Sequence, residues 1–428
     1  MNKINGFGKK ASIYSIAILI LFFVIMYFIA PQIFAVKYDS NVQAQEQGVI
    51  NKLLSKVTKE DVLPVKEENF HLETPEPLKA IYMTSCVVGT PSLREGLVKL
   101  ADETEINSII IDVKDFSGTL SFKPENPDLL HAWEASKCGT RDMKEFLQTL
   151  KEKNIYTIAR VTVFQDPHFT KLHPELAVQS ASTGKPWKDR KGLSFLDVGG
   201  KATWDYTVAI TKEVYDIGFD EINYDYIRYP SDGNMKDTVF KLSSGSKSDQ
   251  LEKFFAYLHT EAKKIGIVTS ADLFGMTTTN TDDLNIGQVL EKTMPYFDYV
   301  APMVYPSHYP PNFNGWKNPN DHVYDLIHFV MGSGARRATA TSTVIWTIGS
   351  EQVASTTPQL YTKAAYPKGK LRTWIQDFDY GGNYDVAEVK AQIKASNDVG
   401  VTSYMIWSPS NRYTRGALEL QTAVNKQQ

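Results

Sequence analysis

From Ala80 onward, hydrophobic and polar positions repeat in one order: a short apolar run, a polar loop, then an amphipathic stretch with helical spacing. The apolar runs are rich in β-branched and aromatic residues, which favour strands. They predict eight strands, at residues 80–86, 108–115, 156–164, 221–227, 268–274, 299–306, 371–378 and 402–408. The amphipathic stretches predict helices at residues 92–105, 141–153, 202–217, 249–265, 286–296, 322–332, 386–399 and 416–424.

Eight strand–helix units over about 350 residues predict an α/β fold of the (β/α)₈ TIM barrel type. A doubly wound open sheet is the alternative, because it uses the same alternation. Two long loops interrupt the pattern, at residues 232–247 and 338–370. The second contains an apolar stretch, 343–348, which predicts an extra hairpin beside the barrel.

The N-terminus has a different pattern. Residues 13–30 are 18 uncharged, mostly apolar residues after three lysines, close to the length that spans a bilayer. We expect residues 1–36 to hold a single transmembrane anchor with a cytoplasmic N-terminus, and a cleaved signal peptide is the alternative. The polar residues 37–77 predict a flexible stalk. Residues 78–428 then form the barrel domain, at the cell membrane and outside the cytoplasm.

Charged residues interrupt the apolar run at Phe219–Pro230, FDEINYDYIRYP, which otherwise has the pattern of one buried strand. Asp225 and Arg228 are unexpected there, because burying a charge costs several kcal/mol unless it is paired. Such groups belong either to an ion pair or to a site. Glu221, at the start of the strand, is expected at the barrel bottom in a structural salt bridge.

The carboxyl ends of barrel strands form the rim at which active sites lie. Polar and aromatic residues gather at these ends in the sequence, and we predict that they surround one site. The predicted catalytic residues are Asp225 and Asp272. The predicted substrate-binding residues are Asp112, Lys114, Asp115, Arg160, Arg228, Tyr305, His308, Gln376, Asp377 and Trp407.

Composition and motifs limit the classes of ligand and of catalytic chemistry that the chain can use. A net charge of −3 without a basic block argues against nucleic acid as a partner. Twelve per cent aromatic residues suit flat, partly apolar ligands such as sugars, although a Tyr-rich core accounts for most of them. The sequence does not support a Ser-His-Asp catalytic triad. It also has no Gly-rich phosphate loop and no cluster of His or Cys at the spacing of metal ligands, so we predict no cofactor and no metal.

Paired carboxylates among aromatic side chains are typical of glycoside hydrolases. One acid protonates the leaving oxygen, and the other either attacks the sugar or activates a water molecule. Asp225 and Asp272 come from neighbouring strands, and Arg228 is expected to keep Asp225 ionised. The predicted partner is a cell-surface or extracellular polysaccharide or an oligosaccharide. One alternative is a non-catalytic carbohydrate-binding or envelope-scaffold barrel. A metal-dependent deacetylase or esterase, with His308 and His168 as ligands, ranks last.

Several segments resemble, in order from about Leu78 to Tyr413, the bacterial putative glycosyl hydrolase domain family. They are IIIDVKD at 109–115, FDEINYDYIRYP at 219–230, ADLFG at 271–275, PMVYPSHY at 302–309 and WIQDF at 374–378. The resemblance implies a TIM-barrel, glycosidase-like domain, and it does not supply a substrate.

Two more distant resemblances concern the fourth strand. It is similar to the chitinase pattern Asp-x-x-Asp-x-Asp-x-Glu, but Ile227 stands where that pattern has its catalytic Glu, so the substrate-assisted mechanism is not implied. The acids on strands four and five resemble those of alpha-amylase-like barrels. That analogy implies a nucleophile at Asp225 and an acid/base at Asp272, where Asp replaces the usual Glu.

Cys86 and Cys138 are the two cysteines, and either a disulfide or a free pair fits the sequence. Trp187 and Trp316 lie in loops with Gly and Pro and are candidate sugar platforms. Trp407 ends the last strand, where it can form the floor of a sugar subsite.

Overall fold

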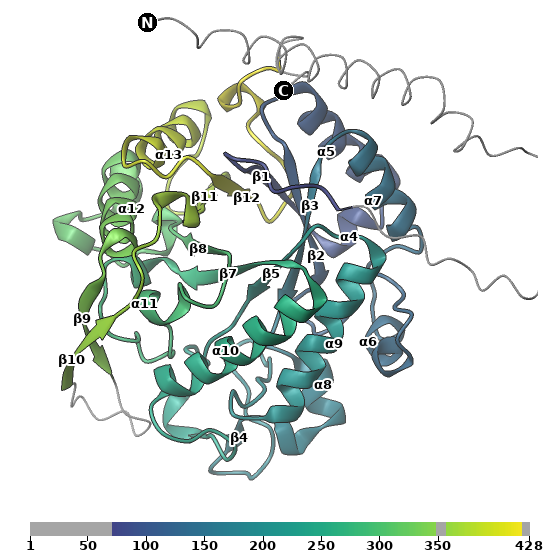
Figure 1. Cartoon of the computed structure of the whole chain (residues 1–428), viewed down its shortest axis with the longest axis vertical. Coiled ribbons are helices and arrows are strands. Elements are labelled where there is room, and N and C mark those ends of the chain that lie inside the picture. The colour runs from purple at the N-terminus through teal and green to yellow at the C-terminus, as the bar shows by residue number, and fades with distance from the viewer. Residues whose placement is uncertain (1–70, 348–356, 422–428) are drawn as a thin grey trace, which may run out of the picture. The chain divides into compact units, whose positions relative to one another are not determined.

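The computed structural model describes residues 71–347 and 357–421, and residues 69–428 form one compact unit. Its centre is a closed barrel of eight strands in the order β1-β12-β11-β8-β7-β5-β3-β2 (Figure 1). All neighbouring strands are parallel. The strands are β1 (Lys79–Met83), β2 (Ser108–Lys114), β3 (Tyr156–Thr162), β5 (Glu221–Asp225), β7 (Val268–Phe274), β8 (Tyr299–Met303), β11 (Thr373–Gln376) and β12 (Tyr404–Trp407).

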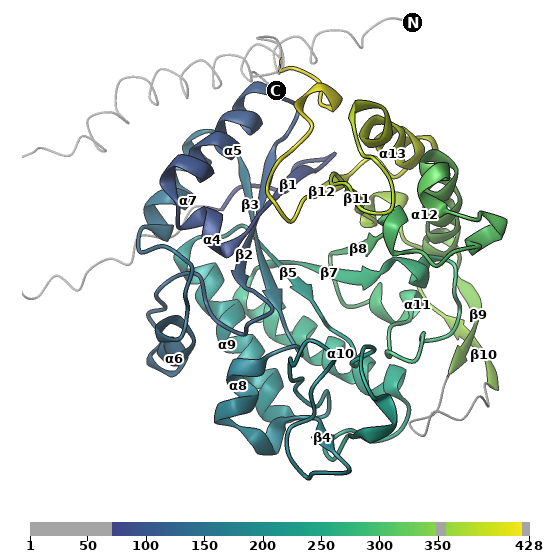
Figure 2. The same ribbon diagram turned by 180° about the vertical axis from the view of Figure 1, so that it is seen from behind.

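The eight predicted strands are therefore confirmed, and so is the barrel. The open-sheet alternative is wrong, because β1 pairs with both β2 and β12 and closes the ring. Helices surround the ring in both views (Figures 1 and 2). They are α4 (Ser85–Val88), α5 (Pro91–Glu103), α6 (Leu130–Glu134), α7 (Met143–Glu152), α8 (Pro167–Leu172), α9 (Lys201–Ile217), α10 (Lys247–Ile265), α11 (Leu290–Thr293), α12 (Val323–Thr339) and α13 (Val386–Asp398).

Local sequence sets the ends of the long helices. Ser246 caps the start of α10 by accepting the backbone N–H of Asp249, and Gly266 ends that helix in a left-handed conformation. Asp385 and Glu388 form a reciprocal capping box at the start of α13. These signals account for the close agreement between predicted and observed bounds in these two helices.

Two predicted helices are wrong in extent. In place of a helix at 286–296, the chain turns through left-handed residues Leu284, Asn285 and Gly287, and α11 has only four residues. In place of a helix starting at 416, a 3-10 turn at Arg415–Ala417 leads into an antiparallel bridge between Thr104 and Leu420. Pairing with the segment after α5 uses the backbone groups that a helix would need. Residues 422–424 of that prediction lie outside the described residues.

The barrel interior is filled in layers. At the bottom, Arg372 and Glu221 form a fully buried ion pair of 2.6 Å, which confirms the predicted salt bridge. Tyr156 and Ser270 donate hydrogen bonds to the same carboxylate at 3.1 and 2.6 Å. An apolar layer lies inside the ring and includes Ala80, Ile110, Ile158, Ala301 and Met405. Outward-facing strand residues such as Ile222 and Tyr224 pack in the cluster that also contains helix side chains.

Two insertions decorate the barrel. The predicted hairpin is confirmed: β9 (Ser342–Thr347) pairs antiparallel with β10 (Thr357–Thr362). A second insertion, which we call the outcrop, combines residues 165–200 and 230–247. In it, β4 (Gln179–Ser180) pairs antiparallel with β6 (Thr238–Val239). The outcrop follows β3 and β5, so it leaves the barrel at the carboxyl ends of these strands.

Residues 71–77 lie against the barrel bottom, where the Leu72 N–H donates to Asp220 and the His71 ring stacks on Tyr215. The predicted anchor at residues 1–36 lies outside the described residues. Within 71–347 and 357–421, no helix has the length and apolar character needed to cross a bilayer. Cys86 and Cys138 form a disulfide.

Candidate functional site

Arg160 is the centre of a charged cluster at the carboxyl ends of β2, β3, β5 and β7. Its Nη1 lies 2.6 Å from Asp112, its Nη2 contacts Asp225, and its Nε lies 3.5 Å from Asp272. The strand register explains this meeting. Asp112 pairs with Arg160 across β2 and β3, and Thr162 pairs with Asp225 across β3 and β5.

Asp225 and Asp272 lie at the same level on adjacent parallel strands. Tyr224 and Ala271 are register partners on β5 and β7, and each is followed by one of the two aspartates. Neighbouring strands are about 4.8 Å apart. Because both carboxylates also contact one guanidinium, they form a pair on a single wall of the barrel mouth.

Asp272 is fully buried, and its two oxygens have different partners. Oδ1 accepts hydrogen bonds from Asn223 Nδ2 at 2.9 Å and from Trp374 Nε1 at 2.7 Å. Oδ2 has no hydrogen-bond partner among the described residues. Burial, and then the negative charge of Asp225, raises the pKa of Asp272 to about 7.

Asp225 has a more polar environment. One oxygen contacts Arg160, and the other accepts the backbone N–H of Tyr226 at 2.6 Å. Asp112, by contrast, contacts both Arg160 and the Tyr82 hydroxyl, and burial raises its pKa.

Tyr226 directly follows Asp225 with a positive φ of 51°, a conformation that a residue with a Cβ rarely adopts. This turn ends the strand alternation. Tyr226 therefore lines the mouth of the barrel and also packs against the outcrop cluster of Val178, Trp187 and Phe195. Strained backbone of this kind is frequent at functional sites.

A pocket of about 180 Å³ opens at this rim, and it brings seven of the predicted site residues together. Its lining combines charged and aromatic side chains: Arg160, Asp225, Tyr226, Arg228, Asp272, Phe274, Met303, Tyr305, His308, Trp374 and Trp407. The rings of Tyr305 and Trp407 lie 4.9 Å apart. Burial lowers the pKa of His308 and raises that of Tyr305 well above 10.

Asp112 lies behind this pocket, at Arg160. Four other predicted site residues do not line the pocket. Lys114 is buried against Asp166 at 2.8 Å, and Asp115 accepts hydrogen bonds from Ser85 and Ser117. Gln376 accepts from the Ser307 hydroxyl at 2.7 Å, and Asp377 accepts from Thr414. These contacts organise the loops around the pocket.

Two further expectations are corrected, those for Arg228 and Trp187, and the one for Trp316 stays a prediction. Arg160, rather than Arg228, contacts Asp225. Arg228 points elsewhere because the chain leaves the strand at Tyr226, and it donates to Tyr229 O at 3.1 Å. Trp187 is no exposed platform, since it is 3% exposed in the core of the outcrop. Trp316 is half-buried and stacks on His322.

Sequence reasoning missed several residues of the pocket and its support. Asn223, Trp374 and Tyr82 hold the carboxylates, and Tyr226, Phe274 and Met303 line the walls. Strand alternation is the signal that could have found Asn223, because Asn223, Glu221 and Asp225 share one face of β5. Trp374 is 1% exposed and also lines the pocket, so it belongs to both the core and the rim.

The two histidines of the deacetylase alternative have different neighbours. His308 lines the pocket, while His168 lies 2.9 Å from His131. Over the part of the chain that the structure describes, no group of three His, Cys, Asp or Glu side chains is arranged to hold a metal ion. The cation at the centre of the three rim aspartates is the guanidinium of Arg160 itself.

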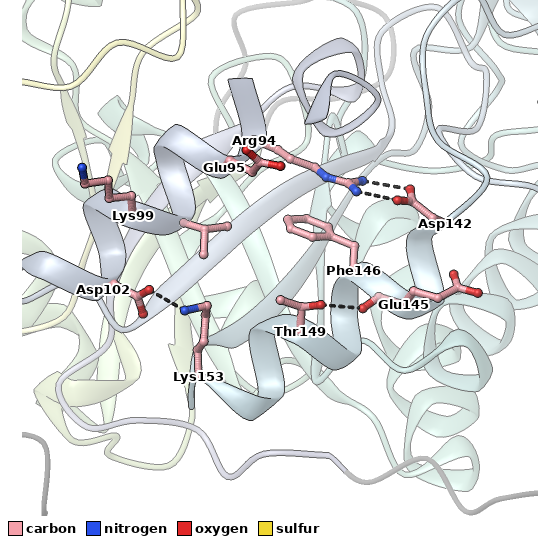
Figure 3. Close-up of a pocket in the computed structure, with 10 residues that line it drawn as sticks. Arg94, Glu95, Lys99, Asp102, Asp142, Glu145, Phe146, Thr149 and Lys153 are labelled. Atoms are coloured by element: carbon pink, nitrogen blue, oxygen red, sulfur yellow. Dashed lines mark hydrogen bonds and ion pairs between the residues drawn. The ribbon is translucent and has the colours of Figure 1, made fainter. Parts of the chain in front are cut away.

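A second hollow lies on the outer surface between α5 and α7 (Figure 3). Its charged groups pair across the two helices, Arg94 with Asp142 and Lys153 with Asp102. The Thr149 hydroxyl donates to the backbone of Glu145. The two ion pairs join α5 to α7, so this hollow is part of the helix packing.

Comparison with known proteins identifies the family of the barrel. A family model described as a putative glycosyl hydrolase domain matches residues 80–413. No curated protein is similar enough in sequence to count as a match.

Solved structures with similar folds include glycoside hydrolases. A hypothetical protein from Ruminiclostridium thermocellum is 34% identical, with a TM-score of 0.40, over 45% of this chain and 96% of its own. The PgaB (BpsB) glycoside hydrolase domain from Bordetella bronchiseptica is 12% identical, with a TM-score of 0.53, over 81% of this chain and 99% of its own. At that identity the second likeness concerns the fold. The family match covers most of the barrel, and the chain therefore belongs to the putative glycosyl hydrolase domain family.

Proposed function

We propose that the barrel hydrolyses or transfers glycosidic bonds in a cell-surface or extracellular polysaccharide, with Asp272 as proton donor and Asp225 as nucleophile or base. The observation behind this proposal is the contrast between two carboxylates in one pocket. Asp272 is fully buried, and its Oδ2 accepts no hydrogen bond and lies 3.5 Å from Arg160 Nε. Asp225 contacts the same guanidinium more closely and also accepts a backbone N–H. Glycosidases separate the roles of two acids in this way.

The proposed reaction uses Asp272 as the acid and the Asp225 carboxylate as the nucleophile or base. With a pKa of about 7, a large fraction of Asp272 is protonated at neutral pH, and Oδ2 can give its proton to the leaving glycosidic oxygen. The Asp225 carboxylate either attacks the anomeric carbon or removes a proton from water. If Asp225 attacks, ionised Asp272 next takes the proton from the incoming water or sugar hydroxyl. Hydrolysis and transfer then differ only in the acceptor.

Aromatic walls support a sugar ligand. Tyr305, Trp407 and Phe274 line the pocket beside the two acids. Ring faces hold the apolar C–H faces of pyranose rings, while His308 and Arg228 offer hydrogen bonds to hydroxyl groups. We assign substrate binding to this set and a positioning role to Asp112, which contacts Arg160.

We further propose that residues 1–36 anchor the protein in the cell membrane and that the barrel lies outside the cytoplasm. The Cys86–Cys138 disulfide supports this placement, because disulfides persist mainly in oxidising compartments.

The second candidate function is a non-catalytic carbohydrate-binding or scaffold barrel. One observation favours it: the Arg160 guanidinium contacts all three rim aspartates, as in a structural ion-pair network. In that case the same pocket binds sugar hydroxyls and no bond is cleaved.

The test is turnover and binding by the purified full-length chain on a panel of bacterial and plant polysaccharides. Asp225→Asn and Asp272→Asn are compared with Asp102→Asn, a carboxylate of the outer hollow between α5 and α7. We expect release of reducing ends, or new oligosaccharides from transfer, to fall at least about 10³-fold in the first two variants while binding persists. The control keeps its activity. Binding without turnover by the wild type favours the scaffold, and turnover that survives Asp272→Asn contradicts the assigned acid.

A further inference from the structure

The pocket contains two guanidinium groups with opposite charge balance. Arg160 contacts three carboxylates. Arg228 has only neutral partners: it donates to Tyr229 O at 3.1 Å and to Ser231 Oγ at 3.2 Å. Among the side chains that the structure describes, no carboxylate forms an ion pair with Arg228. Arg228 is therefore the guanidinium of this pocket whose charge no carboxylate of the described structure compensates.

We propose that Arg228 binds an anionic group of the substrate, so that the protein acts on an acidic glycan carrying carboxylate or phosphate groups. This inference rests on the proposed function and specifies its substrate class. A guanidinium is planar and donates two parallel hydrogen bonds to such groups. The Tyr226 ring lies 4.9 Å from the Arg228 guanidinium and orients it by a cation–π contact, which leaves its remaining N–H groups available.

A cleft in the outcrop provides an independent observation. Its volume is about 690 Å³, and Lys171, Lys185 and Lys188 line it. All three lysines are exposed, and within the described residues none of them forms an ion pair with a carboxylate. Hydroxyl and amide groups of Ser180, Thr183, Ser194 and Asn234 belong to the same lining.

One acid, Asp237, lines the cleft beside the three lysines, so the lining holds more positive than negative groups. The Asp237 carboxylate accepts hydrogen bonds from Ser180 Oγ at 2.7 Å and from the Ser182 backbone at 2.8 Å, which hold it in a turn. Asp189 accepts the backbone N–H groups of Lys191 and Leu193 and does not line the cleft. The excess of lysines favours a negatively charged ligand.

Pocket and cleft are neighbours. Tyr226 lines the pocket, Trp187 lines the cleft, and both belong to one packed cluster. Asn234 and Asp237, on the loop that follows Arg228, also line the cleft. A polymer with repeated negative charges can therefore place one charge at Arg228 and later ones along the lysines, whereas a neutral polymer receives hydrogen bonds from these groups but forms no ion pair with them.

The experiment measures binding in the full-length Asp272→Asn background, so that hydrolysis does not interfere and a failed turnover assay leaves the result interpretable. The probes are polygalacturonate for carboxylates, poly(glycerol phosphate) for phosphates, neutral dextran, and cationic chitosan. Arg228→Gln is the test variant. Arg336→Gln is its matched control, an exposed arginine on α12 that does not line the pocket. A triple variant, Lys171→Gln with Lys185→Gln and Lys188→Gln, tests the cleft.

We expect one of the two anionic polymers to bind at least about tenfold more tightly than dextran, with affinity that falls as salt rises. Arg228→Gln should lower this affinity about tenfold, Arg228→Lys should restore part of it, and Arg336→Gln should leave it unchanged. The triple variant should weaken binding of long chains more than of short oligomers. Equal or tighter binding of dextran or chitosan, binding of neither anionic polymer, or anion binding unaffected by Arg228→Gln would overturn the proposal. Which anionic polymer binds identifies the group.

Discussion

Asn223 Nδ2 donates a hydrogen bond of 2.9 Å to Asp272 Oδ1 across the adjacent strands β5 and β7. Trp374 Nε1 donates to the same oxygen at 2.7 Å. With two donors on Oδ1, a proton on Asp272 is held at Oδ2, the oxygen without a hydrogen-bond partner in the described structure. Asn223 and Trp374 thus decide which oxygen of the proposed acid is available for proton transfer.

The first prediction concerns the pKa of Asp272. Hydrogen bonds from Asn223 and Trp374 stabilise its ionised form and lower its pKa, so Asn223→Ala or Trp374→Phe should raise the pKa. One hydrogen bond contributes about 1 kcal/mol, and 1.36 kcal/mol corresponds to one pH unit. The alkaline limb of the kcat/KM profile should therefore move up by about half to one pH unit in each variant.

A pH–rate profile from pH 4 to 10 checks this prediction, with circular dichroism to verify folding. Asn320→Ala, outside the pocket, is the control and should keep the wild-type profile. An alkaline limb that stays in place in both variants, at reduced kcat, would mean that Asp272 is not the titrating acid.

The second prediction concerns stability as a function of pH. The folded pKa of Asp272 is raised to about 7, above the ordinary value of an unfolded aspartate, so folding becomes less favourable as pH rises from about 4 to about 7. Asp272→Asn removes this penalty. The variant should match the wild type near pH 4 and exceed it at pH 8 by up to about 4 kcal/mol.

Denaturant unfolding of both proteins at pH 4, 6 and 8 measures the difference directly. Asn320→Ala replaces a side chain that does not titrate and lies outside the pocket, so its stability difference from the wild type should not grow with pH. A stability difference between Asp272→Asn and wild type that does not grow with pH would show that Asp272 is ionised throughout.

Period-two alternation was sufficient to predict the eight strands and to point Asp112, Arg160, Asp225 and Asp272 toward one rim. The alternation ends after Asp225, because Tyr226 adopts a positive φ, which is not expected for a tyrosine. The sequence therefore predicts Arg228, a near neighbour of Asp225 in the chain, as the partner of Asp225. In the structure the partner is Arg160, which the register of β3 and β5 brings to Asp225. Contacts across the barrel interior between distant segments, such as Trp374 on β11 with Asp272 on β7, cannot be obtained from local pattern alone.

The third prediction concerns the barrel bottom. Arg372→Met removes the cation beside Glu221, and both side chains are fully buried. An unpaired buried charge destabilises a protein by about 3–5 kcal/mol. Unfolding in guanidinium chloride should show a loss of this size, while KM and kcat per folded molecule remain near wild type because the pair lies at the end of the barrel opposite the pocket. A large change in KM with little loss of stability would instead connect this pair to the site.

The fourth prediction concerns the Cys86–Cys138 disulfide, which links residues 52 positions apart. Closing a loop of that length reduces the entropy of the unfolded chain by an amount worth about 4 kcal/mol at most, so replacing both cysteines by serine should lower the free energy of unfolding by about 2–4 kcal/mol. Treatment of the wild type with a reductant should reproduce the decrease and should not affect the double variant. The disulfide lies between α4 and the loop after α6, outside the pocket lining, so activity at low temperature should persist. Unchanged stability on reduction would mean that non-covalent contacts already hold these two segments together.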